Sequence, residues 1–330
     1  MQLDFINTIN KINQFYREES GTIYVPGNFS TPGFWVVLAA YAKLKRIEKG
    51  SIFFENQSLE SDATAIGLSK ALWDSDNFRH DRKNVGLNYS SLECLDRPES
   101  TDKATSCINN CVRKMFSAVQ VPETFVSQAC DVIGDVHDNV WSHGMASGFS
   151  VAQKWPVNHH DDSDYWFEFA LADSGIGLLG EIKRCGLKGI ANNHREAIEW
   201  CIQEGNSTKK PCSQDDWAQT MPADIINNPL RGIEKTNFSN ENHHQGLGLS
   251  KLVRFVDAAG GQLWLASGDC ALKRSFNGQR SYITLTSLWS GVALACRFRW
   301  SIIKNNFKPI QTSSRIQQIK QQLLKGGRHE

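Results

Sequence analysis

Residues 135–143 read Asp135-Val-His-Asp-Asn139-Val-Trp-Ser-His143, the first of three short segments on which the interpretation of this chain depends. They close a longer segment, 122–143, whose apolar side chains recur at helical spacing and predict an amphipathic helix. Asp135 and Asn139 stand four positions apart, so on a helix they project from one face and can meet the same ligand. An amide oxygen can ligate Mg²⁺, and a nearby carboxylate can orient or deprotonate water. The alternative is that both residues form the solvated edge of the helix.

The second segment, residues 167–177, reads Phe-Glu-Phe-Ala-Leu-Ala-Asp-Ser-Gly-Ile-Gly. Its alternation predicts a strand that carries the apolar residues and Asp173 on one face. A carboxylate at the end of an apolar row needs a hydrogen-bond donor, and the amino group of adenine would supply one. Gly175 and Gly177 let the backbone turn tightly against a flat base. An ordinary β-turn with Asp-x-Gly chemistry is the alternative.

The third segment is Gln245-Gly246-Leu247-Gly248-Leu249, which opens a predicted helix. Backbone N–H groups at a helix start can cradle phosphate where no Cβ stands in the way. A lone Gly-x-Gly is common in proteins without this function. The order of the three segments therefore carries more information than any one of them.

Together the segments resemble the histidine-kinase-like ATPase superfamily, which includes gyrase B, the 90-kDa heat-shock chaperone, histidine kinases and mismatch-repair MutL. Residues 135–139 are similar to its N box, residues 173–177 to its adenine-reading box, and residues 246–249 to its second glycine box. Asn139 followed by His143-Gly144 looks most like the standalone sensor-kinase and anti-sigma-factor-kinase branch. The resemblance covers roughly residues 85–300.

This resemblance implies a two-layer α/β sandwich in which helices cover a mixed sheet and a lid closes over ATP. It implies ATP and Mg²⁺ as cofactors, with Asn139 as the magnesium ligand, Asp173 as the adenine reader and Asp135 at the catalytic position. The lid would be residues 205–245. The remaining nucleotide-binding residues would be Gly175, Gly177, Thr208, Lys209, Gly246, Leu247, Gly248 and Leu249. His143 is either close to the site or a packed histidine at the helix end, and Lys209, Lys210 and Arg231 either reach phosphates or are ordinary surface cations.

The chain departs from the family pattern in two ways. Most members carry Glu where this chain has Asp135, and aspartate is one methylene shorter, so ATP binding is predicted more firmly than hydrolysis. No His-x-x-x-Thr-Pro phosphoacceptor helix precedes the ATPase-like region, which argues against an ordinary two-component sensor kinase. A large transducer domain, as in gyrase or MutL, is not expected either.

Periodicity divides the chain into three parts. Residues 1–82 predict a small α/β domain, residues 83–302 the ATP-binding domain, and residues 303–330 a polar, basic tail with helical spacing. The first part is similar to the small sulfate-transporter and anti-sigma-antagonist domain, or it is an extension that packs on the ATPase or on a partner. The predicted helices are residues 1–20, 32–42, 62–72, 101–119 and 122–143. The predicted strands are residues 22–26, 51–55, 88–95, 165–173, 260–267, 281–288 and 292–300, with irregular stretches at 150–163 and 205–245.

Composition excludes several classes of function. The 330 residues carry 36 Lys and Arg against 35 Asp and Glu, a balance that argues against nucleic acid as a partner. No apolar run approaches the ~20 residues of a membrane helix. The 9 cysteines form no C-x-x-C pair, and the first residues do not form a signal peptide. We therefore expect a cytoplasmic protein with reduced thiols and no membrane partner.

Three functions stay open at this point. The first is an ATP–Mg²⁺-binding regulatory protein with weak ATPase or protein serine/threonine kinase activity on a partner protein. The second is a switch that binds ATP and grips or releases a partner with little turnover. The third is an ATP-dimerised clamp of the chaperone or DNA-repair type, since dimers are common in the resembling families.

Overall fold

The computed structural model describes residues 2–27, 29–76, 78, 81–117, 121–140, 146–158, 161–206, 208 and 248–307. They form a mixed α/β fold, as expected, around a five-stranded sheet with the order β6-β7-β8-β10-β9. Its strands are β6 (Glu93–Leu95), β7 (Gly148–Asn158), β8 (Asp161–Asp173), β9 (Gln262–Arg274) and β10 (Arg280–Arg299). The resemblance implies a mixed sheet, whereas the four pairings among these strands are all antiparallel. None of the described helices is both long and apolar enough to cross a membrane.

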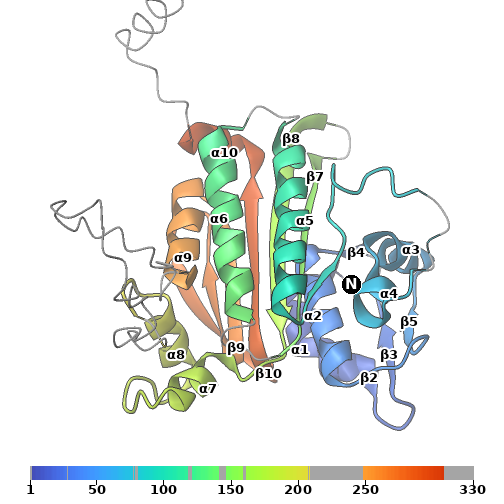
Figure 1. The fold of residues 1–330 in the computed structure, drawn as a ribbon, viewed down its shortest axis with the longest axis horizontal. Helices are drawn as coiled ribbons and strands as arrows, with labels where there is room; N and C mark the ends of the chain where they lie inside the picture. Colours follow the sequence, from blue (N-terminus) through green and yellow to red (C-terminus); the bar gives the residue numbers. More distant parts are fainter. Residues whose placement is uncertain are drawn as a thin grey trace, which may run out of the picture.

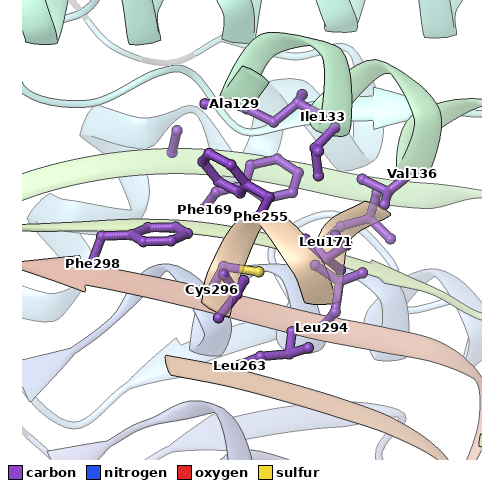
Figure 2. Packing of buried hydrophobic residues seen from close by; sticks show 14 of the residues in the cluster. Ala129, Ile133, Val136, Phe169, Leu171, Phe255, Leu263, Leu294, Cys296 and Phe298 are labelled. Carbon is purple, nitrogen blue, oxygen red and sulfur yellow. The ribbon is translucent and has the colours of Figure 1, made fainter. Parts of the chain in front are cut away.

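Four helices cover one face of this sheet (Figure 1). They are α5 (Pro98–Ser117), α6 (Glu123–Asn139), α9 (Gly248–Ala259) and α10 (Trp300–Asn306). The apolar stripe of α6 packs against alternate residues of the sheet, and Figure 2 shows Ile133 and Val136 above Leu171. Strand alternation thus directs the row that ends at Asp173 toward α6, as the sequence predicts.

The opposite face of the sheet is covered by the N-terminal part of the chain, mainly by α1 (Phe5–Phe15) and α2 (Pro32–Leu44). Residues 32–42 of α2 are all buried. The sheet meets α2 with small side chains, including Ala170 and Ala172 of β8, which allow a close approach. Residues 1–82 therefore share a hydrophobic core with the sheet and form a third layer on it.

A buried carboxylate joins these layers. Glu168 on β8 is fully buried and accepts the backbone N–H of Gly33 in the first turn of α2 at 2.9 Å. The Arg297 guanidinium pairs with the same carboxylate at 2.6 Å and lies over the rings of Trp155 and Trp264. A negative charge at a helix N-terminus is favourable, so this contact fixes where α2 begins on the sheet.

The N-terminal unit also has strands of its own. A three-stranded sheet has the order β2 (Tyr16–Arg17), β3 (Thr22–Val25), β5 (Ile52–Phe54), in which β3 and β5 are parallel. A short parallel pair joins β1 (Gln2–Leu3) to β4 (Phe29–Ser30). The helix expected at 62–72 is instead two helices, α3 (Gln57–Ile66) and α4 (Leu68–Trp73), because Gly67 between them has a left-handed φ of 82°.

Several other sequence expectations need correction. Residues 150–158 belong to strand β7 rather than to an irregular stretch; helices cover both faces of this strand, so its side chains show no alternation that a sequence could reveal. The two strands expected at 281–288 and 292–300 are one strand, β10, with register shifts on either side of Trp289. Helices α7 (Gly177–Arg184), α8 (His194–Cys201) and α10 were not anticipated. Most of the expected lid, from residue 209, and the tail from residue 308 lie outside the described residues.

Candidate functional site

A pocket lies where α6, α7, α8 and α9 meet the end of β8 and the middle of β10. In Figure 1, α7 and α8 sit beside α9 at one end of the sheet. The pocket volume is about 110 Å³, which is room for roughly four water molecules at ~30 Å³ each. Its lining residues are Val136, Asn139, Val140, Leu171, Asp173, Gly177, Leu178, Glu181, Trp200, Cys201, Asn206, Thr208, Gly248, Leu249, Val292 and Leu294.

Asp173 supplies the pocket with a buried carboxylate. It ends β8, is 4% exposed, and its Oδ1 accepts the N–H groups of Gly175 at 2.8 Å and Val292 at 3.3 Å. No described residue donates to the other oxygen, Oδ2. Burial raises the pKa of Asp173 from 3.8 to about 6, and the two N–H groups oppose this rise only in part. The carboxylate is therefore short of hydrogen-bond donors, which a ligand amino group would relieve.

Gly177 allows the chain to turn beside Asp173. Gly177 has a φ of +70°, and a Cβ there would lie 2.8 Å from the Oγ of Ser267 and from the carbonyl oxygen of Ser290. The same Ser267 hydroxyl accepts the N–H of Leu178 at 3.0 Å, which fixes the start of α7. Gly175 does not line the pocket; its part is the N–H that orients the Asp173 carboxylate.

Asn139 and Gly248 lie next to each other in a second wall of the pocket. Asn139 is the last residue of α6, and Gly248 is the first residue of α9. A Cβ on Gly248 would lie 2.8 Å from Nδ2 of Asn139, so a larger residue at this position would displace the Asn139 amide. The amide of Asn139 therefore lies beside the first turn of α9, where backbone N–H groups are not used within the helix.

Asp135 lies one turn before Asn139 but does not line the pocket. Its carboxylate is buried, and Oδ2 lies 2.8 Å from Nζ of Lys251 on α9. Although Asp135 and Asn139 lie on the same face of α6, only Asn139 lines the pocket. His137, between them, is fully buried and bonds to the hydroxyls of Thr105 and Ser150, both at 2.8 Å. Burial lowers its pKa to about 3, so it is a neutral, structural histidine.

Helices α7 and α8 contribute residues that the sequence did not single out. Glu181 is buried at the pocket wall, pairs with Arg184 at 2.7 Å and accepts the hydroxyl of Thr208 at 3.3 Å. Trp200 and Cys201 line the same wall, and burial raises the pKa of the Cys201 thiol to about 12. The signal that could have found them is the amphipathic spacing of two short helices in residues 177–201.

Of the twelve expected site residues, the structure describes eight and brings six of these together in the pocket. The expected residues that line the pocket are Asn139, Asp173, Gly177, Thr208, Gly248 and Leu249. The expected residues that lie outside the described part of the chain are His143, Lys209, Gly246 and Leu247. Within that part, no group of three or more His, Cys, Asp or Glu side chains could hold a metal ion by itself.

The comparisons with known proteins add no relative. No protein-family model matches the chain, and neither the curated proteins nor the solved structures contain a match. The function of the chain is therefore inferred from the pocket and from the chemistry of its residues.

Proposed function

We propose that this protein is an ATP–Mg²⁺-binding regulatory protein of the histidine-kinase-like ATPase superfamily, with weak ATPase or protein serine/threonine kinase activity on a partner protein. One observation carries the proposal: Asn139, Asp173 and Gly248, from three segments far apart in sequence, line a single pocket. The sheet with α5, α6, α9 and α10 on one face supports the proposal, because the resemblance implies a sheet covered by helices. The antiparallel pairing of its strands and the N-terminal unit on its other face differ from the implied sandwich.

The adenine base fits the buried end of the pocket. Oδ2 of Asp173 can accept its amino group, while Leu171, Val292 and Leu294 offer apolar contacts to the ring. Guanine presents a carbonyl oxygen at the position of that amino group, and two acceptors would then face each other. A site built on a buried hydrogen bond rejects a ligand that cannot make it, so ATP is preferred over GTP.

The phosphates and Mg²⁺ fit the opposite wall. The start of α9 favours negative charge, and the absence of a Cβ at Gly248 lets the Asn139 amide lie beside this first turn. Protein-bound Mg²⁺ usually takes one or two protein oxygens and completes its shell with phosphates and water. The Oδ1 atom of Asn139 would hold the ion there, and the ion would neutralise phosphate charge.

A second candidate function is the switch that binds ATP with little turnover. The Asp135–Lys251 ion pair favours it, because the carboxylate that would orient water is instead held 2.8 Å from the ammonium group of Lys251. That carboxylate also lies outside the pocket lining. Both features make Asp135 less suited to activate a water molecule in the pocket.

Calorimetric titration with ATP and Mg²⁺ tests the proposal directly. We expect one saturable site at Asp173 that is lost in Asp173→Asn and in Asn139→Ala, and that is preserved in Asp131→Ala, an exposed residue of the same helix α6. γ-Labelled ATP then separates the two functions: free phosphate or a labelled protein indicates an enzyme, and retained intact ATP indicates the switch. Absence of ATP binding to the wild-type protein would refute both.

A further inference from the structure

An ion pair joins α6 to α9 one helical turn beyond the start of α9. Lys251 lies three residues after Gly248 on α9, and its Nζ atom is 2.8 Å from Oδ2 of Asp135 on α6. Asp135 in turn lies four residues before Asn139, whose amide lies beside Gly248. The two helices therefore contact each other at two successive turns, through one close approach and one ion pair.

The two members of the ion pair differ in their exposure to solvent. The side chain of Asp135 is 6% exposed, whereas that of Lys251 is 31% exposed. A buried carboxylate needs a cation beside it, so Asp135 holds the ammonium group at this place between the helices. An ammonium group carries three N–H donors, and Oδ2 of Asp135 accepts from one of them. Lys251 can therefore bind a second anionic partner without leaving Asp135.

The ammonium group of Lys251 is within reach of the first turn of α9. An α-helix rises ~1.5 Å per residue, so the backbone of Lys251 is ~4.5 Å along the axis from Gly248. Helical side chains lean toward the N-terminus of their helix, and in α9 that end lines the pocket. Asp135 adjoins the same turn, because a Cβ on Gly248 would lie 3.5 Å from the Asp135 carbonyl oxygen. The four-carbon stem of lysine can span this short distance.

Lys251 is also the cation of α9 that lies nearer the pocket. Arg254, one turn further along the helix, is exposed and pairs with Glu204 at 2.7 Å. Among the described residues that line the pocket, none is Lys or Arg. A lysine ammonium group is a common phosphate ligand because it acts as a compact point charge. The proposed phosphate position therefore has one suitable cation beside it on α9.

We propose that Lys251 binds the phosphate chain of the nucleotide and bridges it to Asp135. The inference rests on the ATP site proposed above and adds a protein cation to it. The ammonium group then lies between two anions and offsets their mutual repulsion. Because adenosine has no phosphate, Lys251 contributes to the affinity for ATP and not to the affinity for adenosine.

Calorimetric titration of the full chain with ATP and Mg²⁺, and separately with adenosine, tests this role. Lys251→Met keeps a long unbranched side chain and removes the charge. It should weaken ATP binding by roughly 10- to 150-fold, the ratio that corresponds to the loss of a charged hydrogen bond worth ~1.5–3 kcal/mol. Its affinity for adenosine should equal that of wild type. Arg254→Met is the matched control on the same helix, and both of its affinities should be unchanged.

A second pair of variants separates phosphate binding from folding. Lys251→Met leaves the buried Asp135 carboxylate unpaired, which destabilises the protein. Asp135→Asn removes that charge, so Asp135→Asn alone and Asp135→Asn combined with Lys251→Met differ only in the ammonium group. The combined variant should bind ATP roughly 10- to 150-fold more weakly than Asp135→Asn, and the two should bind adenosine equally.

Two results would overturn the role of Lys251 and leave the proposed function in place. One is that ATP binds the combined variant as tightly as it binds Asp135→Asn. The other is that ATP and adenosine lose affinity to the same extent, since the effect of Lys251 would then be structural. If the wild-type protein does not bind ATP, the proposed function fails and this inference fails with it.

Discussion

Replacing Asp173 by asparagine should stabilise the ligand-free protein and abolish ATP binding. The buried carboxylate has a pKa raised from 3.8 to about 6, so keeping it charged at neutral pH costs on the order of 3 kcal/mol of folding free energy. The asparagine oxygen can still accept the N–H groups of Gly175 and Val292, while its new amide hydrogens face the pocket. We therefore expect a gain of about 1–3 kcal/mol.

The stabilisation expected for Asp173→Asn depends on pH. Because the folded-state pKa is the higher one, the cost is fully present above about pH 6 and disappears as the pH falls toward 4. For 330 residues the entropy of unfolding is ~0.7 kcal/mol/K, so the expected rise in melting temperature at pH 8 is about 1.5–4 °C. This difference from wild type should shrink steadily between pH 6 and pH 4.

Scanning calorimetry at several pH values, with and without ATP and Mg²⁺, measures both effects. Saturating ATP should raise the melting temperature of wild type but not that of Asp173→Asn. Asp164→Asn on the same strand is a control in which the expected change in stability has the opposite sign. Burial raises the pKa of Asp164, but hydrogen bonds from Arg299 and Ser301 outweigh burial and hold that pKa below its usual value. That variant should be less stable at pH 7. An Asp173→Asn protein that is less stable than wild type at pH 8 would refute the reasoning.

Three further predictions concern the packing around the pocket and the back of the sheet. Gly248→Ala places a Cβ 2.8 Å from the amide nitrogen of Asn139 and should weaken ATP–Mg²⁺ binding by at least tenfold in calorimetry. An unchanged affinity would show that the Asn139 side chain can move aside without loss of binding. Asp135→Glu extends the carboxylate by one methylene and should raise phosphate release from labelled ATP, and an unchanged rate would mean that reach does not limit turnover. Glu168→Gln leaves Arg297 without its ionic partner and should lower the free energy of unfolding by about 3–5 kcal/mol in urea, whereas a loss below 1 kcal/mol would contradict a buried ion pair.

Local sequence patterns predicted the elements that carry a clear period. The apolar stripe of α6 and the alternation of β8 were both readable, because one face of each element is apolar and the other polar or small. β7 was missed because helices cover both of its faces, and α7 and α8 were missed because each has only two turns. A short element contributes too few residues for its period to stand out.

The sequence by itself indicated which residues can take part in a nucleotide site: a helix that carries Asn139, a strand ending in Asp173 and a glycine turn at Gly248. Tertiary structure decided which candidate residues share a pocket. Asp135, for example, pairs with Lys251, 116 positions away, and does not line the pocket. Tertiary structure also decided that residues 1–82 cover the back of the sheet. The physical reason is that periodicity identifies only which side of one helix or strand is buried. Which other element packs against that side is set by long-range packing, side-chain volume and charge.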